Sequence, residues 1–305
     1  MHDVIIIGAG PAGYTAGIYC ARARHDTLLI SGILPGGQLM NTTDVENYPG
    51  FSDGIMGPDL MAVMRKQTEK MGTKIIDDEV TSVDFKNRPL KVKTASEEFE
   101  ARAVIVCTGA NPRKIGLEGE QTFAGKGVSY CATCDGAFFR DQELIVVGGG
   151  DSAMEEAIFL TKFASVVHIV HRKEEFRASK IMQERALSNE KIKVHFNSTV
   201  KEIHGDQKFQ QVVLNNTKTN EDKILEAGGL FIAIGHEPNS AIFQDQIELD
   251  GNGYIIIKNN TETSVTGVFC AGDVHDHMYR QAVTAAGFGC MAAIDVDKYL
   301  SESNT

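Results

Sequence analysis

The sequence predicts an α/β protein composed of two doubly wound, parallel-sheet domains, of which the second is inserted into the first. Two glycine-rich turns, each following an apolar run and opening a helix, are the first observation: "VIIIGAGPAGYTAGIYC" and "LIVVGGGDSAMEEA". The second is that "AVIVCTG", "GLFIAIGHEPN" and "GVFCAGDV" have the pattern of buried strands that run into a glycine. Such strand–turn–helix units build parallel sheets with ligand sites at the carboxyl ends of the strands.

The composition disfavours several classes of protein. The chain has 305 residues, 42% of them hydrophobic, and a net charge of −11. Nucleic-acid binders normally carry a basic face, so we expect no DNA or RNA partner. No apolar run approaches the ~20 residues that span a bilayer, and the N-terminus lacks the basic leader of a signal peptide. We therefore expect a cytoplasmic protein without a membrane partner.

The first glycine turn predicts a dinucleotide site. Gly8, Gly10 and Gly13 fit G-x-G-x-x-G directly after an apolar run. These glycines permit a tight turn, close approach of a pyrophosphate and close helix–strand packing, and the helix start attracts the phosphates. About 20 residues further on, such a site usually carries an acid for the ribose. Ser31 and Gly32 stand there instead, so the residues alone leave the first ligand open.

The second glycine turn repeats the pattern. The strand predicted at 144–147 precedes Gly148, Gly150 and Ala153, which fit G-x-G-x-x-A, and a helix follows. The two domains are therefore both of the Rossmann-like, three-layer type.

A basic cluster follows the next predicted strand, "SVVHIV". The strand runs into His171, Arg172 and Lys173, with Arg177 close behind, where an NAD site would carry Asp or Glu. Guanidinium groups bind phosphates with two parallel hydrogen bonds, so this cluster favours the 2′-phosphate of NADP over NAD. The alternative is a solvated basic patch.

The two turns and the later strands predict a discontinuous layout. The first domain comprises 1–112 and 238–305, and the second comprises 113–237. The residue before a proline favours extended backbone, so Asn111-Pro112 and Glu237-Pro238 are the predicted hinges. After the last strand, Asp273 is expected near the first ligand, with a helix from near Arg280.

The first domain is expected to carry two further features. "GPDLMAVMRKQTEKMG" predicts an amphipathic helix. Its core face would consist of Leu60, Val63, Met64, Gln67 and Met71. "TKIIDDEVTSVDF", "LKVKT" and "FEARAVIV" predict a small β layer.

"CATCDG" contains the one close cysteine pair, Cys131 and Cys134. A zinc site needs four ligands and this motif supplies two, so we expect no metal. A disulfide closing so small a loop restrains little chain entropy, which disfavours a structural staple. A redox dithiol fits best, with Asp135 as its acid and base. Because nicotinamide donates hydride and a disulfide takes electrons, a flavin is the usual intermediary, which points to FAD in the first domain.

These motifs together resemble the low-molecular-weight thioredoxin reductases of bacteria and plants, in the class II pyridine nucleotide-disulfide oxidoreductase family. The resemblance runs from "GAGPAGYTAGIYCARA" through "GGQLMNTTDVENYPG", "CATCDGAFF", "GGGDSAMEEA" and "HRKEEFRA" to "AGDVHDHMYRQAVTAAGFGCMAA". It covers essentially the whole chain, and the joint order of the motifs is what makes it specific.

The resemblance implies where the cofactors and the protein substrate bind. FAD is expected at the loop 31–38, and more widely at Gly8, Gly10, Pro11, Ala12, Gly13, Ser31, Gly32, Gly36, Gly37, Gln38, Leu39, Thr42, Asn47, Val80, Thr108, Gly109, Gly272, Asp273, Arg280, Gln281 and Ala282. NADPH is expected at Gly148, Gly150, Asp151, Ser152, Ala153, Glu156, His171, Arg172, Lys173, Arg177, Ile234 and Gly235. Lys126 and Phe138 match the docking surface for thioredoxin. The "GGQL" loop serves the region where the acid is missing.

The resemblance also implies the reaction. Hydride passes from NADPH to FAD, and the reduced flavin reduces the Cys131–Cys134 disulfide, with Cys134 facing the flavin. The dithiol then exchanges with the disulfide of thioredoxin. The inserted domain rotates between these steps, and the enzyme is a homodimer. Family members often have a second arginine at Lys173, and lysine keeps the charge but loses the fork geometry, so some use of NADH is expected.

Four other readings stay open. The peroxiredoxin-reducing flavoprotein carries an additional N-terminal thioredoxin-like module, which we do not expect before Val4. A flavin-dependent ferredoxin reductase lacks the cysteine pair, and a dithiol oxidase needs no NADPH site. A non-catalytic NADPH sensor would not need C-x-x-C followed by Asp. The remaining cysteines, Cys20, Cys107, Cys270 and Cys290, are expected to be core side chains, and His168 and His204 structural or solvated.

Overall fold

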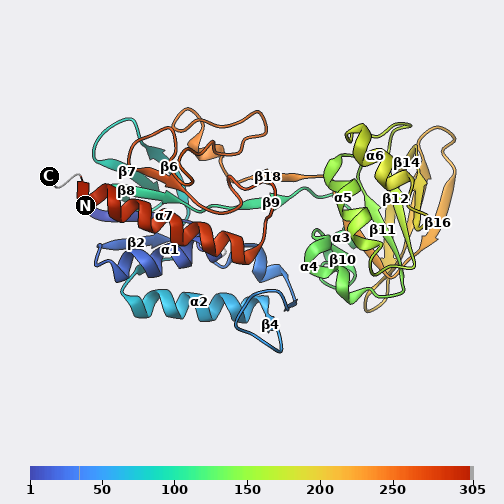
Figure 1. Ribbon diagram of the computed structural model, residues 1–305, viewed down its shortest axis with the longest axis horizontal. Helices are drawn as coiled ribbons and strands as arrows, with labels where there is room; N and C mark the ends of the chain where they lie inside the picture. The colour runs from blue at the N-terminus through green and yellow to red at the C-terminus, as the bar shows by residue number, and fades with distance from the viewer. Residues whose placement is uncertain (34, 303–305) are drawn as a thin grey trace. The chain divides into compact units, whose positions relative to one another are not determined.

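The chain forms two compact units in the computed structural model (Figure 1), which describes residues 1–33 and 35–302. Leu34, within the loop predicted to bind FAD, and residues 303–305 lie outside this description. Unit 1 comprises residues 1–111 together with the chain from Glu237 onward, and unit 2 comprises Pro112–His236.

Unit 1 is built on a seven-stranded sheet with the order β5-β2-β1-β8-β7-β6, and β19 also pairs with β8. Its strands are β1 His2–Ile7, β2 Thr27–Ile30, β5 Lys74–Ile76, β6 Val80–Asp84, β7 Leu90–Thr94, β8 Glu98–Val106 and β19 Val268–Cys270. The neighbours β5, β2, β1, β8 and β19 are parallel, whereas β6 and β7 are antiparallel additions. The long β8 makes this possible, because its first half pairs with β7 and its second half with β19.

The predicted β layer therefore differs in detail from the observed one. The segment "TKIIDDEVTSVDF" contains two strands, of which β5 belongs to the parallel sheet. The antiparallel β6 and β7 continue the same sheet through β8 and form no separate layer.

Helices pack on the sheet of unit 1 through small residues. These helices are α1 Pro11–Arg22, α2 Gly57–Met71 and α7 Ala282–Glu302. Unit 1 also contains the short 3-10 helices η1 Gly37–Asn41 and η3 Ala241–Phe243, and the paired strands β3 Asp44–Val45 and β4 Ile55–Met56. A Cβ on Gly289 of α7 would lie 2.1 Å from the Ala12 carbonyl oxygen. Glycine at this position therefore lets α7 approach α1 closely.

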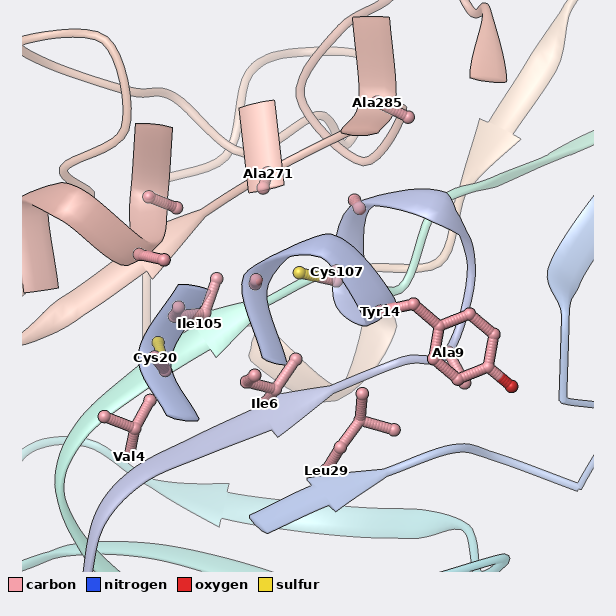
Figure 2. Close-up of a cluster of buried hydrophobic side chains, with 14 of the residues drawn as sticks. Val4, Ile6, Ala9, Tyr14, Cys20, Leu29, Ile105, Cys107, Ala271 and Ala285 are labelled. Carbon is pink, nitrogen blue, oxygen red and sulfur yellow. The ribbon is translucent and has the colours of Figure 1, made fainter. Parts of the chain in front are cut away.

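Two cores cover the two faces of this sheet. Alternate residues of β1 point to opposite faces, so Val4 and Ile6 join one buried cluster while Ile5 and Ile7 join the other. Figure 2 shows the first cluster, where side chains of the sheet meet Tyr14 and other residues of α1. The burial of Val4–Ile7 on both faces explains why the segment reads as a continuous apolar run.

The buried face of α2 is rotated from the predicted one. Leu60 and Met64 are buried as expected, but Val63 is 49% exposed. Met61 and Thr68 are buried in its place. The face of α2 that carries Thr68 is buried because it packs against α1. A Cβ on Gly17 of α1 would lie 2.8 Å from the Thr68 methyl group.

Unit 2 combines a five-stranded parallel sheet, β10-β17-β11-β12-β13, with a three-stranded antiparallel sheet, β14-β15-β16. The strands are β10 Val128–Ser129, β11 Glu143–Val147, β12 Val166–Val170, β13 Ile192–His195, β14 Ser198–Gly205, β15 Phe209–Asn216, β16 Asp222–Glu226 and β17 Gly229–Ile232. The helices are α3 Glu118–Thr122, α4 Ala132–Asp135, η2 Gly136–Phe138, α5 Asp151–Leu160 and α6 Lys180–Leu187.

The chain passes between the units in two short strands, β9 Ala110–Pro112 and β18 His236–Pro238, which pair with each other. Beside them, the Arg113 amide donates to the Gly235 carbonyl at 2.9 Å. Among the described residues, no helix is both long and apolar enough to cross a membrane. No group of three or more His, Cys, Asp or Glu in that part of the chain is arranged to hold a metal ion.

Candidate functional site

The first glycine turn joins β1 to α1 and is closed by backbone. A Cβ on Gly8 would lie 2.4 Å from the Cys107 carbonyl oxygen, and one on Gly13 only 1.8 Å from the Gly8 carbonyl oxygen. Gly10 faces open space, and no side chain caps α1, which begins at Pro11. The turn thus leaves room and free N–H groups for an anionic ligand at the start of the helix.

Two other predicted FAD residues of unit 1, Gly36 and Gly272, lie against this turn or the start of α1. The Gly36 amide donates to the Ala9 carbonyl at 2.9 Å, which fixes the loop against the turn. The Asn47 side-chain amide lies 3.4 Å from that of Gln281. Gly272 lies beside Ala12, since an added Cβ would be 3.1 Å from the alanine methyl.

The remaining predicted FAD residues fall into three groups. Gln38 and Leu39 lie within η1. At the ends of elements or in the loops between them stand Gly32, Gly37, Thr42, Thr108, Gly109, Arg280 and Ala282. Val80 is different, because it begins β6 and packs in the second core cluster. The helix predicted to start near Arg280 is α7, which begins at Ala282.

Asp273 presents an unsatisfied carboxylate. Its Oδ1 is buried, and no described residue is its hydrogen-bond partner. Burial and the neighbouring Asp276 raise the pKa of Asp273 to about 7, against the influence of Arg280. A buried acceptor without a partner is costly, so this atom fits a ligand that donates hydrogen bonds.

His275 carries a second buried polar atom on the same loop, which the sequence did not single out. Its Nε2 lacks a partner among the described residues, and the ring packs edge-on against Phe288 at 4.4 Å between centroids. Burial lowers the pKa of His275 to about 4, so the ring is neutral at pH 7.

The second glycine turn joins β11 to α5 in unit 2. A Cβ on Gly148 would lie 2.4 Å from the Ala233 carbonyl oxygen, and one on Gly149 would lie 2.2 Å from the His171 ring. Gly150 faces open space, and no side chain caps α5. This turn therefore has the same open helix start as the first.

The segment after β12 folds back over this turn. The Arg177 amide donates to the Gly149 carbonyl at 2.7 Å, and the Ser179 amide and hydroxyl both donate to Asp151 at 2.8 Å. His171 is buried and bonds the Glu175 carbonyl at 3.0 Å. Burial lowers the pKa of His171.

Three predicted phosphate ligands are exposed on that segment. The side chains of Arg172, Lys173 and Arg177 have no ion-pair partner among the described residues. Glu174, which stands between them, pairs instead with Lys218. The segment thus presents three cations to solvent beside the second turn. The other predicted NADPH residues, Ser152, Ala153, Glu156, Ile234 and Gly235, lie on α5 or directly after β17.

The cysteine pair lies between β10 and η2. Cys131 and Cys134 form a disulfide with their Cα atoms 5.3 Å apart, and Cys131 stands at the start of the one-turn helix α4. The Cys134 amide donates to the Cys131 sulfur at 3.2 Å. Such a bond favours a thiolate on Cys131 once the disulfide is reduced.

Asp135 is hydrogen-bonded to Ser129, a residue that the sequence did not single out. The Ser129 hydroxyl donates to Asp135 at 2.6 Å, and its oxygen accepts from the Cys131 amide at 3.0 Å. Burial raises the pKa of Asp135, and the bond from Ser129 opposes the rise. A carboxyl with a raised pKa is suited to proton transfer near neutral pH.

Both residues predicted to dock the protein substrate are exposed. Lys126 is exposed, and Phe138 is 43% exposed. Tyr130, which precedes Cys131, bonds a buried carboxylate. The side chain of Glu120 accepts hydrogen bonds from the Tyr130 hydroxyl at 3.0 Å and the Gly116 amide at 2.7 Å. Burial of Tyr130 raises its pKa, and the charge of Glu120 adds to the rise.

Two Rossmann-type units, one of which carries a disulfide in addition to its own glycine turn, define a dinucleotide-dependent disulfide oxidoreductase. Residues 2–289 match the pyridine nucleotide-disulphide oxidoreductase family, and the chain belongs to that family.

Its relatives narrow the class. The chain is 54% identical to the thioredoxin reductase of Streptomyces clavuligerus, covering 99% of this chain and 94% of that one. It is 51% identical to the bifunctional thioredoxin reductase/thioredoxin of Mycobacterium leprae, over 99% of this chain and 66% of that one. The crystal structure of thioredoxin reductase from Streptococcus pyogenes MGAS5005 has 44% identity, a TM-score of 0.95 and 99% coverage of both chains.

Proposed function

We propose that this chain is a thioredoxin reductase, in which NADPH reduces the Cys131–Cys134 disulfide through FAD and the dithiol reduces thioredoxin. The observation that carries this proposal is the disulfide itself, whose Cys131 amide is linked through Ser129 to Asp135, in the unit that also holds the second glycine turn. The full-length similarity to thioredoxin reductases supports it. The overall reaction is NADPH + H⁺ + thioredoxin disulfide → NADP⁺ + thioredoxin dithiol.

The residues of unit 1 suit FAD. The open start of α1 at Gly10 can bind its pyrophosphate. The unsatisfied Oδ1 of Asp273 can accept a hydrogen bond from a hydroxyl of the ligand. When bound, FAD supplies the two-electron relay between nicotinamide hydride and the disulfide.

The residues of unit 2 suit NADPH and the exchange step. Arg172, Lys173 and Arg177 would bind the 2′-phosphate, beside the open start of α5. Cys131 attacks the thioredoxin disulfide as a thiolate, and Cys134 then displaces thioredoxin from the mixed disulfide, which restores the Cys131–Cys134 bond. Asp135 donates and accepts the proton that accompanies these steps.

We also propose that unit 2 rotates about β9 and β18 during turnover. Both the dithiol and the second glycine turn belong to unit 2, whereas the flavin residues belong to unit 1. One fixed arrangement cannot bring nicotinamide and dithiol to the same flavin and also admit a protein substrate. A crosslink between the units should stop thioredoxin turnover, and full turnover in the crosslinked protein would refute the rotation.

A homodimer and a cytoplasmic location complete the proposal. Val283, Met291 and Ile294 form an exposed apolar stripe on α7, with the spacing of one helix face. A second copy of the chain would cover it, and light scattering of Ile294→Glu tests this. The free thiols of Cys20, Cys107 and Cys270, all buried, suit a reducing compartment.

The decisive test uses the purified full chain with NADPH and thioredoxin. Cys134→Ser should abolish thioredoxin turnover while NADPH still bleaches the flavin absorbance. Cys290→Ser, at a partly exposed free cysteine of α7, is the matched control and should keep turnover. Turnover that survives Cys134→Ser would refute the redox role of the pair.

A further inference from the structure

The end of β2 lacks the acid that usually binds ribose in this type of fold. Ser31 follows β2 directly and is 5% exposed. The loop that continues from it reaches the glycine turn at Gly36, and between Ser31 and Gln38 the sequence contains no Asp or Glu. The ribose of a bound dinucleotide would therefore find no carboxylate on its own strand.

The neighbouring strand brings a carboxylate to this position. β2 and β5 are parallel with Ile30 opposite Ile76, so the residues that follow them meet at one edge of the sheet. The Ser31 amide donates to the Ile76 carbonyl at 3.0 Å, and the Ser31 hydroxyl lies 2.9 Å from Oδ1 of Asp77. The Asp77 side chain is 51% exposed and is therefore within reach of a ligand.

Arg65 of α2 fixes the orientation of this carboxylate. Its two terminal nitrogens donate to Oδ1 and Oδ2 of Asp77 at 2.8 and 2.9 Å, while its Nε donates to Glu69 at 3.1 Å. The bonds from Arg65 lower the pKa of Asp77, which stays ionised at neutral pH.

One acceptor position of Asp77 remains for a ligand. A carboxylate has about four lone-pair positions on its two oxygens. Oδ1 accepts hydrogen bonds from Ser31 and Arg65. Among the described residues, Oδ2 accepts one hydrogen bond, from Arg65. A hydroxyl donor fits the free position, and a phosphate would be repelled by the negative charge.

We propose that Asp77, oriented by Arg65 and bonded to Ser31, binds the ribose hydroxyls of the adenosine half of FAD in place of the missing acid. The inference rests on the proposed function, since it requires FAD in unit 1. It places the residue that binds the ribose directly after β5, one strand away from its usual position after β2, and makes the Ser31–Asp77 pair the local substitute for a single Glu or Asp.

Flavin retention tests the proposal independently of turnover. The full chain is loaded with FAD, or with FMN, which has the same flavin but no adenosine. Loss of bound flavin on dilution is then followed by flavin fluorescence. Asp77→Asn should weaken FAD retention about 10- to 100-fold, the effect of one charged hydrogen bond, and leave FMN retention unchanged.

Two further variants separate ribose binding from a general effect on α2. Glu69→Gln removes the negative charge of the other partner of Arg65 and should leave FAD retention at the wild-type value. Ser31→Glu added to Asp77→Asn returns a carboxylate to the end of β2 and should recover retention. Equal weakening of FAD and FMN by Asp77→Asn, or unchanged FAD retention, would overturn the assignment. A chain that binds no flavin at all would instead refute the proposed function.

Discussion

The Ser129 hydroxyl donates to the Asp135 carboxylate at 2.6 Å, while its own oxygen accepts the amide of Cys131. One side chain thus links the acid to the backbone of the first redox cysteine. Because the donated bond favours the charged carboxylate, Ser129 limits how far burial can raise the pKa of Asp135.

Ser129→Ala should therefore raise the pKa of Asp135 further. The loss of a donor to the ionised form leaves burial unopposed, so the pH limb of thioredoxin turnover that Asp135 governs should move to higher pH. A pH profile of the variant measures the shift. Ser188→Ala, on an exposed serine after α6, should show the wild-type profile. If the pH dependence of turnover is the same in Ser129→Ala as in the wild type, Asp135 is not the group whose proton controls the rate.

The two cysteines should differ when each is replaced in turn. The amide of Cys134 bonds the Cys131 sulfur, which favours Cys131 as the attacking thiolate. Cys134→Ser should accumulate a mixed disulfide with thioredoxin, because the displacing thiol is gone, and Cys131→Ser should not. Non-reducing electrophoresis or intact mass measurement detects the adduct. Accumulation in Cys131→Ser alone would reverse the two roles.

The exposed cations after β12 should determine the preference for NADPH over NADH. Arg172→Ala should raise the KM for NADPH roughly tenfold or more, by removing a charged hydrogen bond to the 2′-phosphate, and leave the KM for NADH unchanged. Lys173→Arg should increase the preference for NADPH, because a guanidinium binds phosphate with a fork. Lys208→Ala, at an exposed lysine of the same unit, is the control. Equal changes for both nucleotides would contradict the assignment.

Gly10 and Gly13 should respond differently to alanine. A methyl on Gly13 meets the Gly8 carbonyl at 1.8 Å, so Gly13→Ala should lower the free energy of unfolding by about 3 kcal/mol or more. Gly10 has no heavy atom within 4 Å of such a methyl, so Gly10→Ala should keep its stability within about 0.5 kcal/mol. It should nevertheless weaken FAD binding, because the methyl occupies the ligand's space. Thermal melts and FAD retention distinguish these effects.

His195 should make unit 2 sensitive to acid. Its ring lies 2.9 Å from His168, which also bonds Glu143 at 2.8 Å. Burial, and the charges of His168, Lys223 and Lys193, lower its pKa from 6.5 to about 4. The unfolded chain therefore binds the proton more readily between these values. The stability that the neutral ring contributes is present above pH 6.5 and is lost as pH falls toward 4.

The corresponding variant is His195→Gln. Urea unfolding measures how far the free energy of unfolding falls between pH 7 and pH 4.5. This acid loss should be smaller in the variant than in the wild type, by an amount on the order of 1–2 kcal/mol after solvent screening. His204→Gln, at an exposed histidine that pairs with Glu202, should retain the full acid loss. Identical acid losses in His195→Gln and the wild type would exclude His195 as the source.

Local sequence pattern was sufficient for the elements that carry the two turns. The apolar run at Val4–Ile7 is a strand buried on both faces, and glycine spacing specified the turn after it. The helix α2 was harder to predict. Buried Thr68 bonds the Tyr14 and Met64 carbonyls and has the sequence character of a surface residue, so the buried face was misplaced by about one position.

The residues that sequence analysis missed depend on neighbours far along the chain. Asp77 meets Ser31 only because β5 pairs with β2, and His168 meets Glu143 and His195 only because β12 lies between β11 and β13. A single sequence contains no signal for such cross-strand pairs. Ser129 lies close to Asp135 in sequence, but nothing in its type distinguishes it from other serines near a turn.

The pairing of β9 with β18 gives the molecule the organisation of an exchangeable cassette. Unit 2 enters and leaves through adjacent strands, and Arg113 and Gly235 are hydrogen-bonded to each other at its ends. A segment whose ends meet can be removed or swapped without stretching the remaining chain. Two junctions, one on each strand, would thus suffice to graft a different nucleotide preference or a different protein-substrate surface onto the same flavin-binding unit.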